Sequence, residues 1–66
     1  MKWIPYITRG VKETRAIKSE DGRYSICRIT LRDIDLFELW KGKVFVSSHD
    51  TAKEAKEAAD EQARTQ

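Results

Sequence analysis

Cysteine, proline and glycine are scarce in this sequence of 66 residues, which contains one, one and three of them. A single cysteine excludes an internal disulfide framework. The sequence has only one histidine as well, so it cannot form a four-ligand cysteine–histidine zinc site. No apolar run approaches the roughly 18 residues that a membrane-spanning helix needs, and there is no signal peptide or lipidation motif. We therefore expect a cytoplasmic protein in a reducing, intracellular setting, with no membrane partner.

The sequence also lacks the motifs of common enzymes. It has no glycine-rich phosphate loop and no nucleophile elbow. Cys27 and His49 are far apart, and no third group is available to position either of them in a catalytic dyad. The acids near the carboxyl end are interspersed with basic residues, which is typical of a solvated helix face. We expect no catalytic residue, metal, cofactor or small-molecule substrate, and hence no enzyme.

The charge is unevenly distributed along the chain. Residues 1–32 hold eight lysines and arginines and three acids, which gives a charge of +5. Residues 33–66 hold five lysines and arginines and eight acids, which gives −3, and the net charge of the chain is +2. A basic half of this kind favours an anionic partner. The alternative is that the two halves face each other and neutralise locally.

A carboxyl-terminal helix is the clearest prediction. Thr51 followed three residues later by Glu54 forms a capping box, which starts a helix at Ala52 and gives a helical segment over 51–64. Alanines recur along it at helical spacing. A stripe of alanine cannot fill a core by itself, so the helix must approach a partner that carries larger side chains, and the upstream strand-like runs predict a β-sheet.

The rest of the chain has strand character. Pro5 cannot donate to a β-ladder, so residues 1–10 form an edge strand or an extended arm. Residues 11–48 contain the sheet, with an Asp-Gly hairpin signal at Asp21 and a tight turn at Lys41-Gly42. The prediction is a single α+β domain over 1–66, with an antiparallel sheet of three to four strands packed on one C-terminal helix.

Alternation along the strands divides the sheet residues into two faces. We assign to the helix side the face that holds Cys27, Ile29, Leu31, Phe37, Leu39, Val44 and Val46. The opposite face then carries three aromatic and two cationic residues beside Ile26, and with Arg23 of the preceding turn these are the candidate binding residues: Arg23, Tyr24, Arg28, Trp40, Lys43 and Phe45.

Two interpretations of this second face are open. In the first interpretation, the apolar residues near the amino terminus, among them Trp3 and Tyr6, fold back over this face and bury Trp40 and Phe45. Alternatively the face stays exposed and binds a partner. Cations with aromatic rings suit nucleic acid, where phosphates meet Arg and Lys and bases stack on the rings. The same residue types are enriched in the hot spots of protein interfaces.

Residues 22–29 and 44–61 resemble the pattern of AP2-type and integrase N-terminal DNA-binding domains. The resemblance covers about residues 20–63, and it implies a three-stranded sheet that contacts DNA, followed by an alanine-rich helix. By position it implies DNA contacts from Arg23, Arg28, Trp40 and Lys43. Ser47 and His49 stand where those families have glycine and phenylalanine. The chain is also similar to small phage and prophage proteins with a sheet, an alanine-rich last helix and no assigned role.

The leading hypothesis is a small, phage-like, non-enzymatic binding module that docks its basic and aromatic sheet face on nucleic acid. The alternatives are a phage-like protein that binds and inhibits a host protein complex, in defence or regulation, and a homodimeric interaction domain.

Overall fold

The computed structural model describes residues 1–8 and 10–64, and for residues 8 and 11–14 it describes the backbone alone. Five strands precede one helix. Their bounds are β1 (Trp3–Thr8), β2 (Val11–Ser19), β3 (Tyr24–Leu31), β4 (Ile34–Lys41), β5 (Val44–His49) and α1 (Ala52–Arg64).

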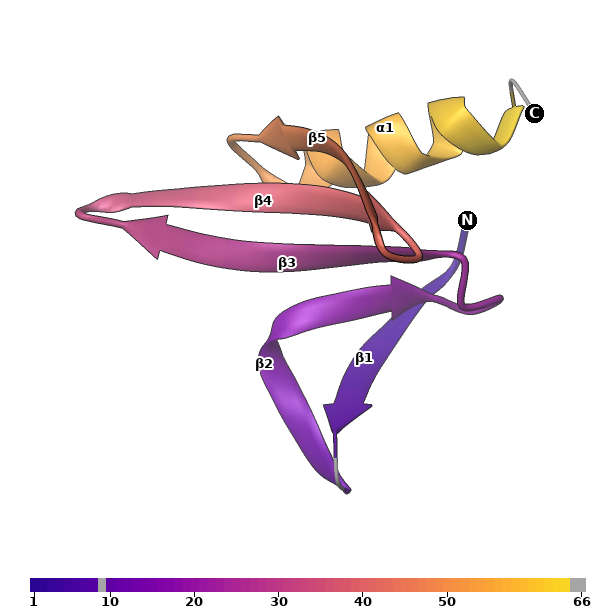
Figure 1. The fold of residues 1–66 in the computed structure, drawn as a ribbon, viewed down its shortest axis with the longest axis horizontal. Helices are drawn as coiled ribbons and strands as arrows, with labels where there is room; N and C mark the ends of the chain where they lie inside the picture. Colours follow the sequence, from indigo (N-terminus) through magenta and orange to yellow (C-terminus); the bar gives the residue numbers. More distant parts are fainter. Residues whose placement is uncertain (9, 65–66) are drawn as a thin grey trace.

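The strands form one antiparallel sheet in the order β1-β2-β3-β4-β5, and α1 packs against one face of it (Figure 1). The predicted α+β class is confirmed, with five strands in place of three or four. The difference lies at the amino terminus, because β1 (Trp3–Thr8) pairs with β2 as an edge strand. Pro5 lies opposite Ile17, and the register shifts between Pro5 and Ile7, as expected for proline at a sheet edge.

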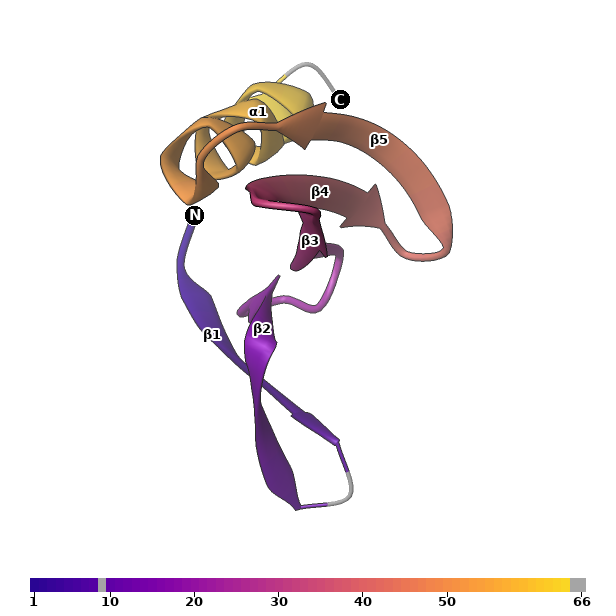
Figure 2. The same cartoon turned by 90° about the vertical axis from the view of Figure 1, so that its left-hand side faces the viewer.

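The β1–β2 hairpin twists away from the rest of the sheet (Figures 1 and 2). β2 is paired with β3 only from Ala16 to Lys18, so the distal part of the hairpin pairs only with itself. The near end is held at the helix, where the Met1 amino group lies 3.1 Å from a carboxylate oxygen of Asp60. The hairpin is therefore anchored at one end and projects from the body at the other.

A buried serine organises the β2–β3 turn. The Ser19 hydroxyl donates to Asp21 Oδ1 (2.6 Å) and accepts from the Tyr24 backbone N–H (3.0 Å), while the Arg23 N–H donates to the same Asp21 oxygen (3.1 Å). Gly22 has a φ of 78°, which glycine adopts without steric cost. This confirms the turn that Asp-Gly predicts.

The helix begins where the capping box predicts. The Glu54 N–H donates to the Thr51 hydroxyl at 3.1 Å, and α1 starts at Ala52. Ala55 and Ala59 are fully buried against the sheet. The larger side chains of the core come from the strands: Tyr24, Ile26 and Leu39 are buried, and Trp3, Ile17, Phe37 and Val46 pack around them with Ala58 of the helix.

The predicted faces of β3 are wrong. β3 and β4 are joined by a turn of two residues, Arg32 and Asp33, so even positions of β3 lie opposite odd positions of β4. Ile26 consequently faces Leu39. The helix side of β3 holds Tyr24, Ile26 and Arg28, and the opposite side holds Cys27, Ile29 and Leu31.

The predicted β4–β5 register is also wrong. Lys41 pairs with Val44 and Trp40 with Phe45, so the turn consists of Gly42 and Lys43, one residue later than expected. A register shift between Leu39 and Trp40 then leaves one extra residue on β5, Val46. Val46 packs on the core as predicted, whereas Val44 is exposed and contributes nothing to it.

Candidate binding surfaces

The structure separates the six predicted site residues. Tyr24 is only 2% exposed and belongs to the core. Arg28 lies opposite Phe37 on the helix side of the sheet. Trp40 and Phe45 pair on the opposite face, and Arg23 and Lys43 belong to the two turns at the same end of the sheet.

The face of the sheet that points away from α1 is here called the outer surface. It follows from the register that β3 presents Ser25, Cys27, Ile29 and Leu31 there, opposite Trp40, Glu38, Leu36 and Ile34 of β4. β1 does not cover it: Trp3 packs on the helix-side core, and Phe45 stays 47% exposed. The amino-terminal segment therefore does not bury Phe45, whereas Trp40 is half-buried.

One end of the outer surface carries aromatic rings. Trp40 and Phe45 pair across β4 and β5 with ring centroids 5.6 Å apart at 78°, an edge-to-face contact that fixes both rings. The indole N–H of Trp40 donates weakly to Glu38 at 3.4 Å. A backbone hydrogen bond from Gly42 to the Arg23 carbonyl (3.0 Å) holds the two turns at this end side by side. Arg23 and Lys43 therefore belong to neighbouring turns at the same end of the sheet as the rings.

Two further residues join this end that the sequence reasoning did not select. Tyr6 of β1 is 39% exposed, and the Lys18 ammonium lies 5.8 Å from the centre of its ring. Both line a hollow of about 230 Å³ that also includes Arg23 and Gly42. We call the set the aromatic half of the outer surface: Tyr6, Lys18, Arg23, Trp40, Lys43 and Phe45.

The cations of the aromatic half are weakly neutralised. Arg23 Nε lies 3.9 Å from Asp21, a long contact between exposed groups. The pKa of Asp21 is lowered, first by the hydrogen bond from Ser19 and then by the Arg23 N–H and the Arg23 charge. Among the residues that the structure describes, Lys43 has no ion pair. Lys18 likewise has no ion pair with any carboxylate that the structure describes.

The other end of the outer surface is aliphatic. Ile29 faces Leu36 and Leu31 faces Ile34, and these four residues are here called the aliphatic half. Leu31 and Ile34 are 57% and 62% exposed. Cys27 lies between the two halves, where burial and, secondarily, the Glu38 charge raise the pKa of its thiol, so that it stays protonated at neutral pH.

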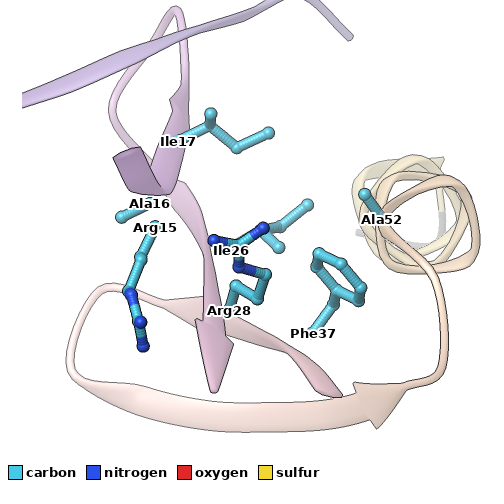
Figure 3. Close-up of a pocket in the computed structure, with 7 residues that line it drawn as sticks. All are labelled: Arg15, Ala16, Ile17, Ile26, Arg28, Phe37 and Ala52. Atoms are coloured by element: carbon cyan, nitrogen blue, oxygen red, sulfur yellow. The ribbon is translucent and has the colours of Figure 1, made fainter. Parts of the chain in front are cut away.

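A separate cleft lies on the helix side, between β2, β3, β4 and the start of α1 (Figure 3). Its volume is about 130 Å³. In Figure 3, the apolar side chains of Ile17, Ile26 and Phe37 point toward α1, whose first residue Ala52 closes the far side. Arg15 and Arg28 complete the lining, and we call this site the arginine cleft.

Comparisons with known proteins give no relative: no family model, no curated protein and no solved structure matches this chain. The resemblance to AP2-type and integrase domains therefore stays a prediction from the motif. No helix in residues 1–8 and 10–64 is long and apolar enough to cross a membrane. Within the same residues no group of three or more His, Cys, Asp or Glu side chains is placed to hold a metal ion.

Proposed function

We propose that this protein is a small, non-enzymatic binding module that holds single-stranded nucleic acid on the aromatic half of its outer surface. The observation that carries the proposal is the gathering, at one end of the sheet, of three aromatic rings and three cations from β1, β2, β4, β5 and the two adjoining turns. Lysine and arginine meet phosphates, and exposed rings stack on unpaired bases at about 1–3 kcal/mol each.

The proposed surface differs in composition from the one expected from sequence. Tyr6 takes the place of Tyr24, which is buried, and Lys18 takes the place of Arg28, which lies on the helix side. Arg23, Trp40, Lys43 and Phe45 retain their proposed role. A single strand suits this surface because its bases are free to stack, whereas the bases of a duplex present only their edges.

The test is fluorescence anisotropy with a labelled, unphosphorylated mixed-sequence single strand and the matching duplex. If the three cations each contact a phosphate, single-strand affinity falls about 20-fold between roughly 50 and 200 mM salt. Lys43→Ala should weaken binding and reduce this salt dependence. The matched control is Arg32→Asn, which removes a turn cation at the opposite end and keeps a residue that tolerates a φ of 57°.

Absence of single-strand binding at the lower salt, with the protein folded by circular dichroism, would overturn the proposal. So would equal losses for Lys43→Ala and Arg32→Asn, because the cations would then act only through net charge.

The aliphatic half favours a second function, self-association, in which a second copy of this chain packs against it. Leu31 and Ile34 are 57% and 62% exposed on this half, and contiguous exposed apolar side chains mark interaction sites. The four aliphatic side chains carry no charge, as in the apolar interfaces of homodimers.

Sedimentation across a concentration series tests the self-association. A dimer that Leu31→Lys dissociates supports it, and a monomer at every concentration overturns it. A monomer would instead favour a different protein as the partner of the aliphatic half, which is the host-protein alternative considered from the sequence.

A further inference from the structure

We infer that the arginine cleft is a second binding site, which takes one nucleotide with its phosphate on Arg28 and Arg15 and its base against Phe37. The cleft is on the opposite face of the sheet from the aromatic half, so the inference goes beyond the proposed function and stands without it. Three observations carry it: the placement of the arginines, the start of the helix and the shape of the cleft.

Neither of the two arginines is neutralised by an acid. The recorded pairing of β2 with β3 ends at Ala16 and Cys27, and Arg15 and Arg28 are the next residue on each strand. Both line the cleft, and neither forms an ion pair with any carboxylate of the described residues. Two guanidinium groups without a counter-charge at one cleft favour an anionic ligand.

The start of α1 adds positive potential to the same cleft. Thr51 caps the N–H of Glu54 through its hydroxyl and that of Ala55 through its carbonyl. The N–H groups of Ala52 and Lys53 have no partner within the helix. Asp50 precedes them but makes no ion pair with Arg28 or Arg15. Guanidinium groups and helix N–H groups are the donors that hold phosphates in many proteins.

The interior of the cleft suits a flat ring. Its volume of about 130 Å³ is close to the ~150 Å³ of a cavity that admits benzene. Phe37 offers an aromatic ring, and Ile17 and Ile26 offer aliphatic surface on the same side (Figure 3). The ligand class that combines a planar ring with a charged group of this strength is a nucleotide.

The guanidinium of Arg28 is the principal anion contact. Arg28 lies on β3 opposite Phe37, and both residues line the cleft. In Figure 3 the Arg15 side chain extends away from α1, so we place it at the rim of the cleft. Loss of Arg28 should therefore cost more affinity than loss of Arg15. A phosphate should be preferred over a carboxylate because it presents more acceptor oxygens and more charge to two arginines.

The test uses adenosine 5′-monophosphate, adenosine, inorganic phosphate and an aspartyl-phenylalanine dipeptide as probes, followed by backbone amide NMR shifts and titration calorimetry. The expected result is that the nucleotide binds at least tenfold more tightly than each of the others. Its shifts should centre on residues 26–28, 37 and 52–53. A 5′-phosphorylated oligonucleotide compared with the free nucleotide shows which source of the phosphate is preferred.

Variants separate this site from the aromatic half. Arg28→Gln should weaken the nucleotide at least tenfold and leave binding of an unphosphorylated strand unchanged, whereas Lys43→Ala should do the reverse. Arg28→Lys should restore part of the affinity. The matched control, Arg32→Asn, alters neither. The inference is overturned if the folded protein shows no nucleotide shifts in the cleft, if Arg28→Gln binds as wild type does, or if the dipeptide binds more tightly than the nucleotide.

Discussion

The two halves of the outer surface are built on the same strands, yet they differ in chemistry. The aromatic half sets Trp40 and Phe45 among cations, next to the β2–β3 and β4–β5 turns. The aliphatic half sets Leu31 and Ile34 at the β3–β4 turn, with charge only in the turn itself. An antiparallel sheet with one covered face normally turns polar residues to solvent. A sheet that is apolar on both faces but charged at one end indicates two contacts of different kinds.

The largest effect is expected from a charge placed in the aliphatic half. Ile34→Lys should raise the dissociation constant of the dimer by more than 100-fold, because each protomer would bury an unpaired ammonium against the other. Sedimentation measures this effect, and anisotropy should show that each protomer still binds a single strand. If strand binding disappears as well, the two halves form a single interface and the comparison fails.

Removing a ring from the aromatic half comes next. Phe45→Ala should weaken single-strand binding about 10- to 100-fold, since one base loses its stacking partner and Trp40 loses the ring that fixes it. Anisotropy gives the size of the loss. Leu31→Ala is the control in the aliphatic half, and an equal loss in both variants would show that the rings act only as apolar area.

The two tyrosines test which side of the sheet is core. The Tyr24 hydroxyl is buried with no hydrogen-bond partner in the described residues. Tyr24→Phe removes this unsatisfied group and should raise the free energy of unfolding by about 1 kcal/mol. Tyr6→Phe changes an exposed ring and should leave the free energy of unfolding unchanged. Urea denaturation compares the two, and a loss of strand binding in Tyr24→Phe would contradict the assignment of Tyr24 to the core.

A smaller effect concerns pH at the β2–β3 turn. The folded-state pKa of Asp21 is below its ordinary value, chiefly through the hydrogen bond from Ser19. A lowered pKa means that the ionised Asp21 stabilises the fold above about pH 4, and that this contribution is lost as the pH falls through the folded-state value. Thermal unfolding of Asp21→Asn should show a shallower loss of stability below pH 4 than wild type. Parallel curves for the two proteins would contradict the prediction.

Local signals were predicted correctly because they depend on neighbouring residues. The capping box starts α1 at Ala52 through a hydrogen bond between Glu54 and Thr51, which are three residues apart in sequence. The Asp-Gly pair makes the β2–β3 turn through contacts within six residues. The α+β class follows as well, since an alanine-faced helix has to pack on a sheet with larger side chains.

The candidate site was only partly predicted. Trp40 and Phe45 were assigned to one face from alternation, and they pair on one face in the structure. Tyr6 and Lys18 were missed because their place at the same end depends on β1 pairing with β2. The arginine cleft had no sequence signal, since Arg28 meets Phe37, Ala52 and Arg15 only when three strands and the helix come together.

The sequence by itself determined the helix, its cap, the turn at Asp21-Gly22 and the α+β class. Only the tertiary structure decided which face of β3 is buried. Both alternating sets of that strand contain large apolar residues, so propensity could not choose between them. A two-residue turn at Arg32 and Asp33 set the parity of pairing, and the bulky Tyr24 and Ile26 then filled the space that the alanines of α1 leave open. That choice moved Arg28 off the outer surface and exposed Leu31 and Ile34.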